Sequence, residues 1–182
     1  CSLDSATLSV SDDARRRTAA FYAPSKTFSL AGLIGSYHII PDPWLRDRVT
    51  RQGDLSHYNS CNVLSLHALL GAYSDVGAQW LDELRTVLAD NIRYACDFIA
   101  AHFPGVQVMQ PQGTYMLFLD CAAWLQEHHM TLRELEERGA RAGVIWQDGA
   151  AFAWPDSIRM NLALPHSRLV EAMERLRVHA FC

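Results

Sequence analysis

One residue in this sequence has a side-chain primary amine, which could form a Schiff base with a carbonyl compound. The chain has 16 lysine and arginine residues in all, and Lys26, within the segment YAPSKTF, is the single lysine among them. Arginine stays protonated and cannot form a Schiff base, whereas a lysine amine can. Lys26 is therefore a candidate nucleophile, and the alternative is a surface lysine left by an arginine-rich composition.

Charge and cysteine spacing argue against several other kinds of site. The formal net charge is −4 and the arginines are spread out, apart from the run at 15–17, so we expect no nucleic-acid partner. Five cysteines form no C-x-x-C pair and leave an odd count, which predicts neither a metal site nor a disulfide framework. A reducing, cytoplasmic location fits this pattern. Neither a signal peptide nor an apolar run near the ~20 residues of a membrane span is evident.

The segments around Lys26 read as alternating strands and helices. Residues 18–23 form an apolar run that ends at Pro24, which predicts a buried strand delivering Lys26 at its end. The apolar segment 61–73 lacks a polar face, which predicts a buried helix. The other elements predicted in this half are a strand over 33–40 and a helix over 43–53, with Pro43 in its first turn and Gly53 at its end.

The second half begins with a helix from Asp75 to His102, whose apolar residues fall on one face. This length exceeds that of an average core helix, and a helix connecting two lobes would account for it. The predicted elements that follow are strands over 106–110 and 114–121 around a turn at Gly113, a helix over 131–143 with a Thr131–Glu134 capping box, strands over 144–147 and 157–164, and a helix over 166–181. These predict an α+β lobe with a small mixed or antiparallel sheet.

Four segments carry a resemblance to a known family. APSKTFSLAGLIGSYHIIPD resembles the lysine segment of the fold type I pyridoxal-phosphate enzymes, and most of all the class I/II aminotransferase branch that includes the cystathionine β-lyase-like C-S lyases. GAYSDVGAQWLDEL, PQGTYMLFLDC and GVIWQDGAAFAWPDSIRMNLALPHSRLVEAMERL resemble later segments of that branch in the same order. The resemblance covers nearly the whole chain after roughly residue 15.

The resemblance implies an α/β fold, namely the C-terminal part of the pyridoxal-phosphate-dependent transferase fold. We expect the end of a large cofactor-binding domain in residues 1–73, a connecting helix in 74–103 and a small α+β domain in 104–182. The sequence does not begin with methionine or with a clear first element, so we also expect it to be a portion of a longer protein.

The resemblance also implies roles for four residues. Lys26 would form the Schiff base with pyridoxal 5'-phosphate and move the substrate Cα proton. Arg159 would hold the substrate α-carboxylate with its planar guanidinium fork, and a structural ion pair is the alternative. Ser25 could help hold the cofactor phosphate, unless it is a local cap. Tyr115 could line the substrate pocket, unless it packs in the core.

These roles predict an enzyme that acts on a small amino-acid substrate by C-S β-elimination or by transamination. Ile34 stands where many aminotransferases of this fold have a phosphate-binding arginine, which favours the lyase-like branch. The resemblance further implies a homodimer with the site near the subunit interface. The alternative is a truncated, non-catalytic module that serves oligomerisation or regulation, with Lys26 as a relic.

Overall fold

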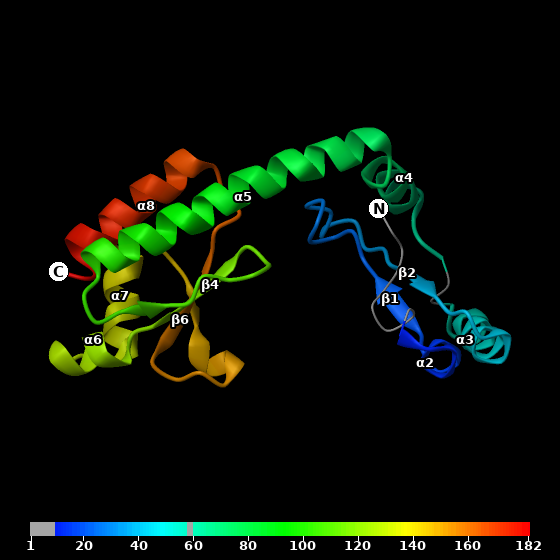
Figure 1. The fold of residues 1–182 in the computed structure, drawn as a ribbon, viewed down its shortest axis with the longest axis horizontal. Helices are drawn as coiled ribbons and strands as arrows, with labels where there is room; N and C mark the ends of the chain where they lie inside the picture. The colour runs from blue at the N-terminus through cyan, green and yellow to red at the C-terminus, as the bar shows by residue number, and fades with distance from the viewer. Residues whose placement is uncertain (1–9, 58–59) are drawn as a thin grey trace. The chain divides into compact units, whose positions relative to one another are not determined.

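The computed structural model describes residues 10–57 and 60–182, and it divides the chain into two compact units, Cys1–Glu83 and Leu84–Cys182 (Figure 1). The division into a large-domain end, a connecting helix and a small domain remains a prediction.

The first unit contains a short antiparallel ribbon in which β1 (Ala20–Tyr22) pairs with β2 (Tyr37–Ile39). β1 is not the buried strand that the sequence predicts, because a single partner strand leaves Phe21 65% exposed. The helices of this unit are α2 (Asp12–Arg16), α3 (Pro43–Ser56), α4 (Val63–Ala72) and the beginning of α5 (Asp75–His102).

Two of these helices depart from the prediction. α3 does not end at Gly53; it continues to Ser56 and stops where His57 adopts a left-handed φ of 58°. α4 is not buried, since Val63, Leu64, Leu66 and Leu70 are 49–65% exposed. A contiguous exposed apolar face of this kind marks a surface that another surface covers.

The second unit is built on a four-stranded antiparallel sheet with the order β3-β4-β6-β5. Its side chains alternate between two faces: Leu117 and Leu119 are fully buried on one face, while Phe118 and Asp120 point to the other. The antiparallel sheet agrees with the α+β lobe that the sequence predicts. The strands are β3 (Gln107–Val108), β4 (Met116–Asp120), β5 (Gln147–Asp148) and β6 (Ser157–Asn161).

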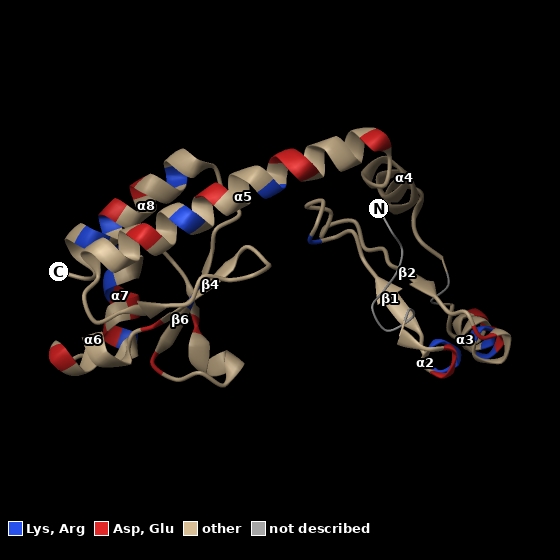
Figure 2. Cartoon of the chain, in the orientation of Figure 1, with Lys and Arg blue, Asp and Glu red and all other residues tan. Residues whose placement is uncertain are grey.

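Helices bury one face of this sheet in a continuous apolar core. Ile99 from α5, Trp124 from α6 (Ala122–Glu127), Leu135 from α7 (Leu132–Arg141) and Met173 from α8 (His166–His179) are all fully buried in it. The opposite face of the sheet carries the groove described below. Figure 2 shows positive and negative residues mixed along α5 and α8. Among the described residues, no helix combines the length and the apolar character that a membrane span requires.

The start of α7 is fixed by a local sequence signal and the start of α8 by contacts with a distant residue. The predicted capping box is present at the start of α7, where the Thr131 backbone N–H donates to Glu134 Oε2 at 2.8 Å. α8 has no side-chain cap at Pro165. Its first residue, His166, instead lies 2.9 Å from Asn91 Oδ1, measured to Nδ1, and the buried Asn91 amide donates to the carbonyl oxygens of Leu162 and Leu164.

Candidate functional site

Lys26 lies in the turn that follows β1. The turn is closed by two backbone hydrogen bonds, from Phe28 N–H to Pro24 O and from Leu30 N–H to Ser25 O, both at 2.9 Å. Ser29 in this turn has a left-handed φ of 54°, and the Lys26 side chain is exposed. Among the residues that the structure describes, no carboxylate forms an ion pair with Lys26, so its amine is accessible to a ligand.

An aromatic cluster anchors this turn within the first unit. The Phe28 ring lies 5.6 Å from Tyr73 and 6.0 Å from Trp80, between ring centroids. Tyr37 stacks on Tyr22 at 5.3 Å, and its hydroxyl lies 3.2 Å from that of Tyr73. Burial, followed by the hydrogen bond with Tyr73, raises the pKa of Tyr37 to about 12. The turn that carries Lys26 therefore rests on a packed, uncharged support.

Ser25 is half-buried and lines a groove of about 1050 Å³ together with Ser36, His38 and Ser60. These groups could supply hydrogen bonds to an anionic ligand. Lys26 is not among the residues that line this groove. The role of Ser25 in holding a phosphate therefore remains a prediction.

Arg159 lies in the middle of β6 in the second unit, paired across the sheet with Phe118 on one side and Gln147 on the other. Its Nη1 donates to Gln147 Oε1 at 3.1 Å, and its guanidinium carbon lies 4.4 Å from the centroid of the Phe152 ring. Within residues 10–57 and 60–182, no Asp or Glu forms an ion pair with Arg159. The structural ion pair is therefore absent from the described residues, and two neutral groups hold the guanidinium.

The guanidinium of Arg159 lines a groove of about 870 Å³ on the open face of the sheet. The groove is largely apolar: the Phe118 ring packs edge-on against Phe152 at 5.7 Å and stacks on Trp154 at 6.3 Å. Asp120 also lines it, with its Oδ1 accepting from Ala122 N–H at 3.0 Å. A cation beside an aromatic wall can hold a ligand that has a carboxylate at one end and an apolar part at the other.

The sheet register separates Tyr115 from this groove. Tyr115 precedes β4 directly, and its carbonyl oxygen accepts from Leu162 N–H at 2.8 Å, so the strand pairing continues through it. Alternation along the strand places position 115 with the buried Leu117 and Leu119, and Tyr115 is not among the residues that line the groove. The structure thus brings Arg159 to the groove and does not bring Tyr115 there.

Sequence reasoning missed the residues that hold Arg159 and line its groove. Phe152 ends the 3₁₀ helix η1 (Gly149–Phe152), which Asp148 caps by accepting from Ala150 N–H at 2.7 Å. Trp154 O accepts from the buried Ser157 hydroxyl at 2.7 Å, which fixes the segment between η1 and β6. The alternation of SIRMN could have placed Arg159 on an open face, but the pairing with Gln147 depends on a register that the sequence does not show.

No metal cluster supplements these groups: among the described residues, no three His, Cys, Asp or Glu side chains lie close enough together to hold an ion.

Residues 3–176 match the family described as aminotransferase class I and II. The chain belongs to this family. A relative with similar sequence is "Cystathionine beta-lyase PatB" of Bacillus subtilis, which is 31% identical over 93% of this chain and 43% of its own length. "Protein MalY" of Escherichia coli is 32% identical over 91% of this chain and 42% of its own length. The resemblance found in the sequence is thereby confirmed.

A solved structure supports the fold of this class I and II aminotransferase chain. Cystalysin from Treponema denticola, whose crystal structure contains a pyridoxal 5'-phosphate cofactor, matches it with a TM-score of 0.82 and 30% identity. The match covers 94% of this chain and 43% of cystalysin. The α/β fold class is confirmed, and the chain spans less than half the length of these relatives.

Proposed function

We propose that this chain is the lysine-bearing and carboxylate-binding part of a pyridoxal-phosphate-dependent enzyme that acts on an amino acid. The observation that carries the proposal is the guanidinium of Arg159, held by Gln147 and Phe152 without a carboxylate among the described residues, on an aromatic groove. Membership in the class I and II family and the cofactor in cystalysin support the choice of cofactor.

Lys26 and Ser25 fit a pyridoxal-phosphate site in their chemistry. The exposed Lys26 amine on its anchored turn can hold the cofactor carbonyl, and the adjacent Ser25 hydroxyl can donate to a phosphate oxygen. When bound, pyridoxal phosphate withdraws electrons from the substrate Cα. The Lys26 Nζ would then take or return the Cα proton as the general base.

Arg159 would orient the substrate by its carboxylate. A bidentate pair between the guanidinium and the α-carboxylate fixes the amino acid in two directions, which limits the orientations open to its Cα–H bond. The rings of Phe118, Phe152 and Trp154 exclude water from one side of this pair and strengthen it. Tyr115 as a substrate contact remains a prediction without support from the groove.

Between the two reactions, the name of PatB, a cystathionine β-lyase, supports C-S β-elimination. Elimination from L-cystathionine consumes one water molecule and releases homocysteine, pyruvate and ammonia, whereas transamination needs a 2-oxo acid that accepts the amino group. The cofactor-loaded protein is incubated with L-cystathionine, with and without 2-oxoglutarate. Pyruvate without the oxo acid supports the lyase, and glutamate formed only with the oxo acid supports the aminotransferase.

The absence of both products from a cofactor-loaded, folded protein would instead favour a non-catalytic module. The exposed apolar face of α4 is the observation that favours a role in association. In either case we propose a homodimer in which this face is covered. The free Cys61, Cys96, Cys121 and Cys182 support a reducing, cytoplasmic location.

A further inference from the structure

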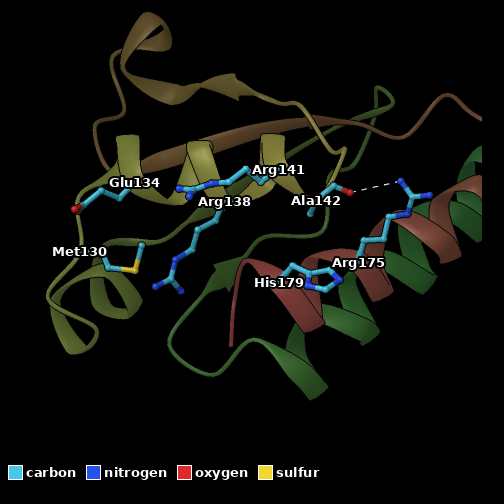
Figure 3. A pocket seen from close by; sticks show the side chains of 7 residues that line it. All are labelled: Met130, Glu134, Arg138, Arg141, Ala142, Arg175 and His179. Carbon is cyan, nitrogen blue, oxygen red and sulfur yellow. Dashed lines mark hydrogen bonds between the residues drawn. The ribbon is translucent and has the colours of Figure 1, made fainter.

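A second pocket, of about 770 Å³, lies in the α6–α7–α8 region of the second unit, and the function proposed above does not use it (Figure 3). The guanidinium groups of Arg138, Arg141 and Arg175 line it, together with the imidazole of His179 and the carboxylate of Glu134. None of these residues is assigned above to the cofactor or the substrate. The volume lies within the range of small-molecule sites.

Helical spacing explains why these side chains converge. Arg138 and Arg141 are three residues apart on α7, and Arg175 and His179 are four residues apart on α8, so each pair shares one face of its helix. α7 and α8 pack against each other, and Arg175 Nη1 donates to Ala142 O, at the end of α7, across 3.5 Å. The two pairs therefore face a common hollow.

The positive charges in this hollow are only partly compensated. Arg141 pairs with Glu137 at 3.8 Å and Arg175 pairs with Glu171, but these side chains are all 42–75% exposed, so the pairs are weak and easily exchanged. Arg138 forms no ion pair with the described residues. Figure 3 shows it reaching from α7 into the space between α7 and α8.

The acidic group that lines the pocket is already engaged. Glu134 Oε2 accepts from both the backbone N–H and the hydroxyl of Thr131 at 2.8 Å in the capping box. These hydrogen bonds, and to a smaller extent the positive charge of Arg138, lower the pKa of the Glu134 carboxyl group. Glu134 therefore serves mainly the start of α7. The helix dipole favours basic residues near the C-terminus of each helix, which could explain the basic residues of α7 and of α8 separately. It does not explain why both helices direct these side chains into one hollow.

We propose that this pocket binds a small, multiply charged oxyanion of the phosphate or polycarboxylate type. Arg138 is the primary contact, because its guanidinium lies in the hollow and forms no ion pair with the described residues. Arg141 and Arg175 add a second and third fork by releasing their exposed carboxylate partners, and His179 supplies a further hydrogen-bond donor.

The test is a calorimetric titration of the full, cofactor-loaded chain with pyrophosphate, and with citrate in a parallel arm, at low salt. We expect saturable binding of at least one of the two that weakens as salt is added. Arg138→Gln and Arg175→Gln should each raise the Kd about tenfold, which is the effect of losing one charge-assisted hydrogen bond. The tighter of the two anions identifies the ligand type.

Arg93→Gln is the matched control, because it removes the same charge from an exposed ion pair with Asp90 on α5, outside the pocket. It should change the Kd less than about twofold. Circular dichroism checks that each variant remains folded. Equal weakening by Arg93→Gln and Arg138→Gln, which indicates diffuse charge attraction, or no saturable binding of either anion at millimolar concentration, would overturn the proposal.

Discussion

The partners of Arg159 bear directly on what this residue can bind. An Asp or Glu partner would compete with a ligand carboxylate for the same N–H groups, whereas the Gln147 amide oxygen and the Phe152 ring leave the positive charge uncompensated. The ring covers one face of the guanidinium, and the amide fixes its rotation. Arg159 is thus oriented before any ligand arrives, which lowers the entropic cost of binding.

Arg159→Lys tests this arrangement because it keeps the charge and removes the planar fork. We expect the KM of the cofactor-loaded protein for its amino-acid substrate to rise by about tenfold or more, since an ammonium group cannot make the bidentate contact. Steady-state kinetics measure the change. Arg168→Lys, on the exposed surface of α8, is the control and should leave the KM unchanged. An unchanged KM in Arg159→Lys would remove the residue from substrate binding.

Cysteine reactivity should follow burial. Burial, with smaller contributions from the charges of Asp120 and Asp156, raises the pKa of the Cys121 thiol from 9.0 to about 12. At pH 8 the native protein should therefore react with a maleimide at the exposed Cys61 and Cys182 and not at Cys121.

The same shift makes one contribution to stability that depends on pH. Because the folded pKa of Cys121 is the higher one, its stabilising contribution is complete below about pH 9 and is lost as the pH rises toward 12. Peptide mapping after maleimide labelling, with and without denaturant, measures the reactivity of each cysteine thiol. Labelling of Cys121 in the native protein as fast as that of Cys182 would show that the thiol is not buried.

Two glycines within helices, Gly139 and Gly71, have opposite surroundings and allow a matched pair of alanine substitutions. A Cβ at Gly139 in α7 would lie 2.3 Å from Trp146 Cη2, whereas a Cβ at Gly71 in α4 would meet nothing within 4 Å. Alanine favours a helix over glycine by about 1 kcal/mol. We expect Gly71→Ala to stabilise α4 by a part of that amount, and Gly139→Ala to destabilise α7 because the Trp146 ring must move.

Amide hydrogen exchange measures this pair of substitutions helix by helix. Slower exchange in α4 of Gly71→Ala and faster exchange in α7 of Gly139→Ala are the expected results. Slower exchange in α7 of Gly139→Ala would mean that the Trp146 ring does not occupy the space above this glycine.

The sequence predicts elements well where the signal is local. The helix Asp75–His102 has the predicted bounds, and the Thr131–Glu134 capping box forms as expected, because periodicity and caps depend on neighbours along the chain. Gly53 did not end α3, since a glycine costs a helix only about 1 kcal/mol. α6 was not predicted because its six residues, AAWLQE, are too short for a periodic signal and its Cys121 cap makes no side-chain hydrogen bond.

Burial and site partners were harder to predict because they depend on distant segments. An apolar composition made α4 look buried, yet the described residues leave its apolar side chains exposed. Lys26 and Arg159 were found from their type and their flanking residues. Gln147 and Phe152 were not, because their contacts with Arg159 arise from the β5–β6 register and from the turn of η1.

In the whole molecule, the two assigned functions fall in different compact units. The cofactor role is assigned to Lys26 in the unit Cys1–Glu83, and the carboxylate role to Arg159 in the unit Leu84–Cys182. The chain spans less than half the length of PatB and MalY. The activity of a complete enzyme is therefore a proposal. These two units support it, but they make up only part of such an enzyme.

The α4 face gives a prediction for assembly. Leu70 is 63% exposed, so Leu70→Arg should leave α4 folded while placing a charge on the surface that we propose is covered in a homodimer. Sedimentation velocity should show a shift from dimer toward monomer. Val10→Arg, at a residue that is 74% exposed and outside α4, is the control and should not change the assembly. An unchanged dimer in Leu70→Arg would exclude this face from the interface.

The most direct test of the central claim uses the fact that Lys26 is the single lysine of the chain. The protein is incubated with pyridoxal phosphate, reduced with borohydride, digested and analysed by mass spectrometry, beside a Lys26→Arg variant. We expect one pyridoxyl-phosphate adduct on the peptide that contains Lys26, retained on dilution before reduction and absent from the variant. An adduct that dilution removes, or none above the level of the variant, would contradict the assignment of Lys26 as the cofactor lysine.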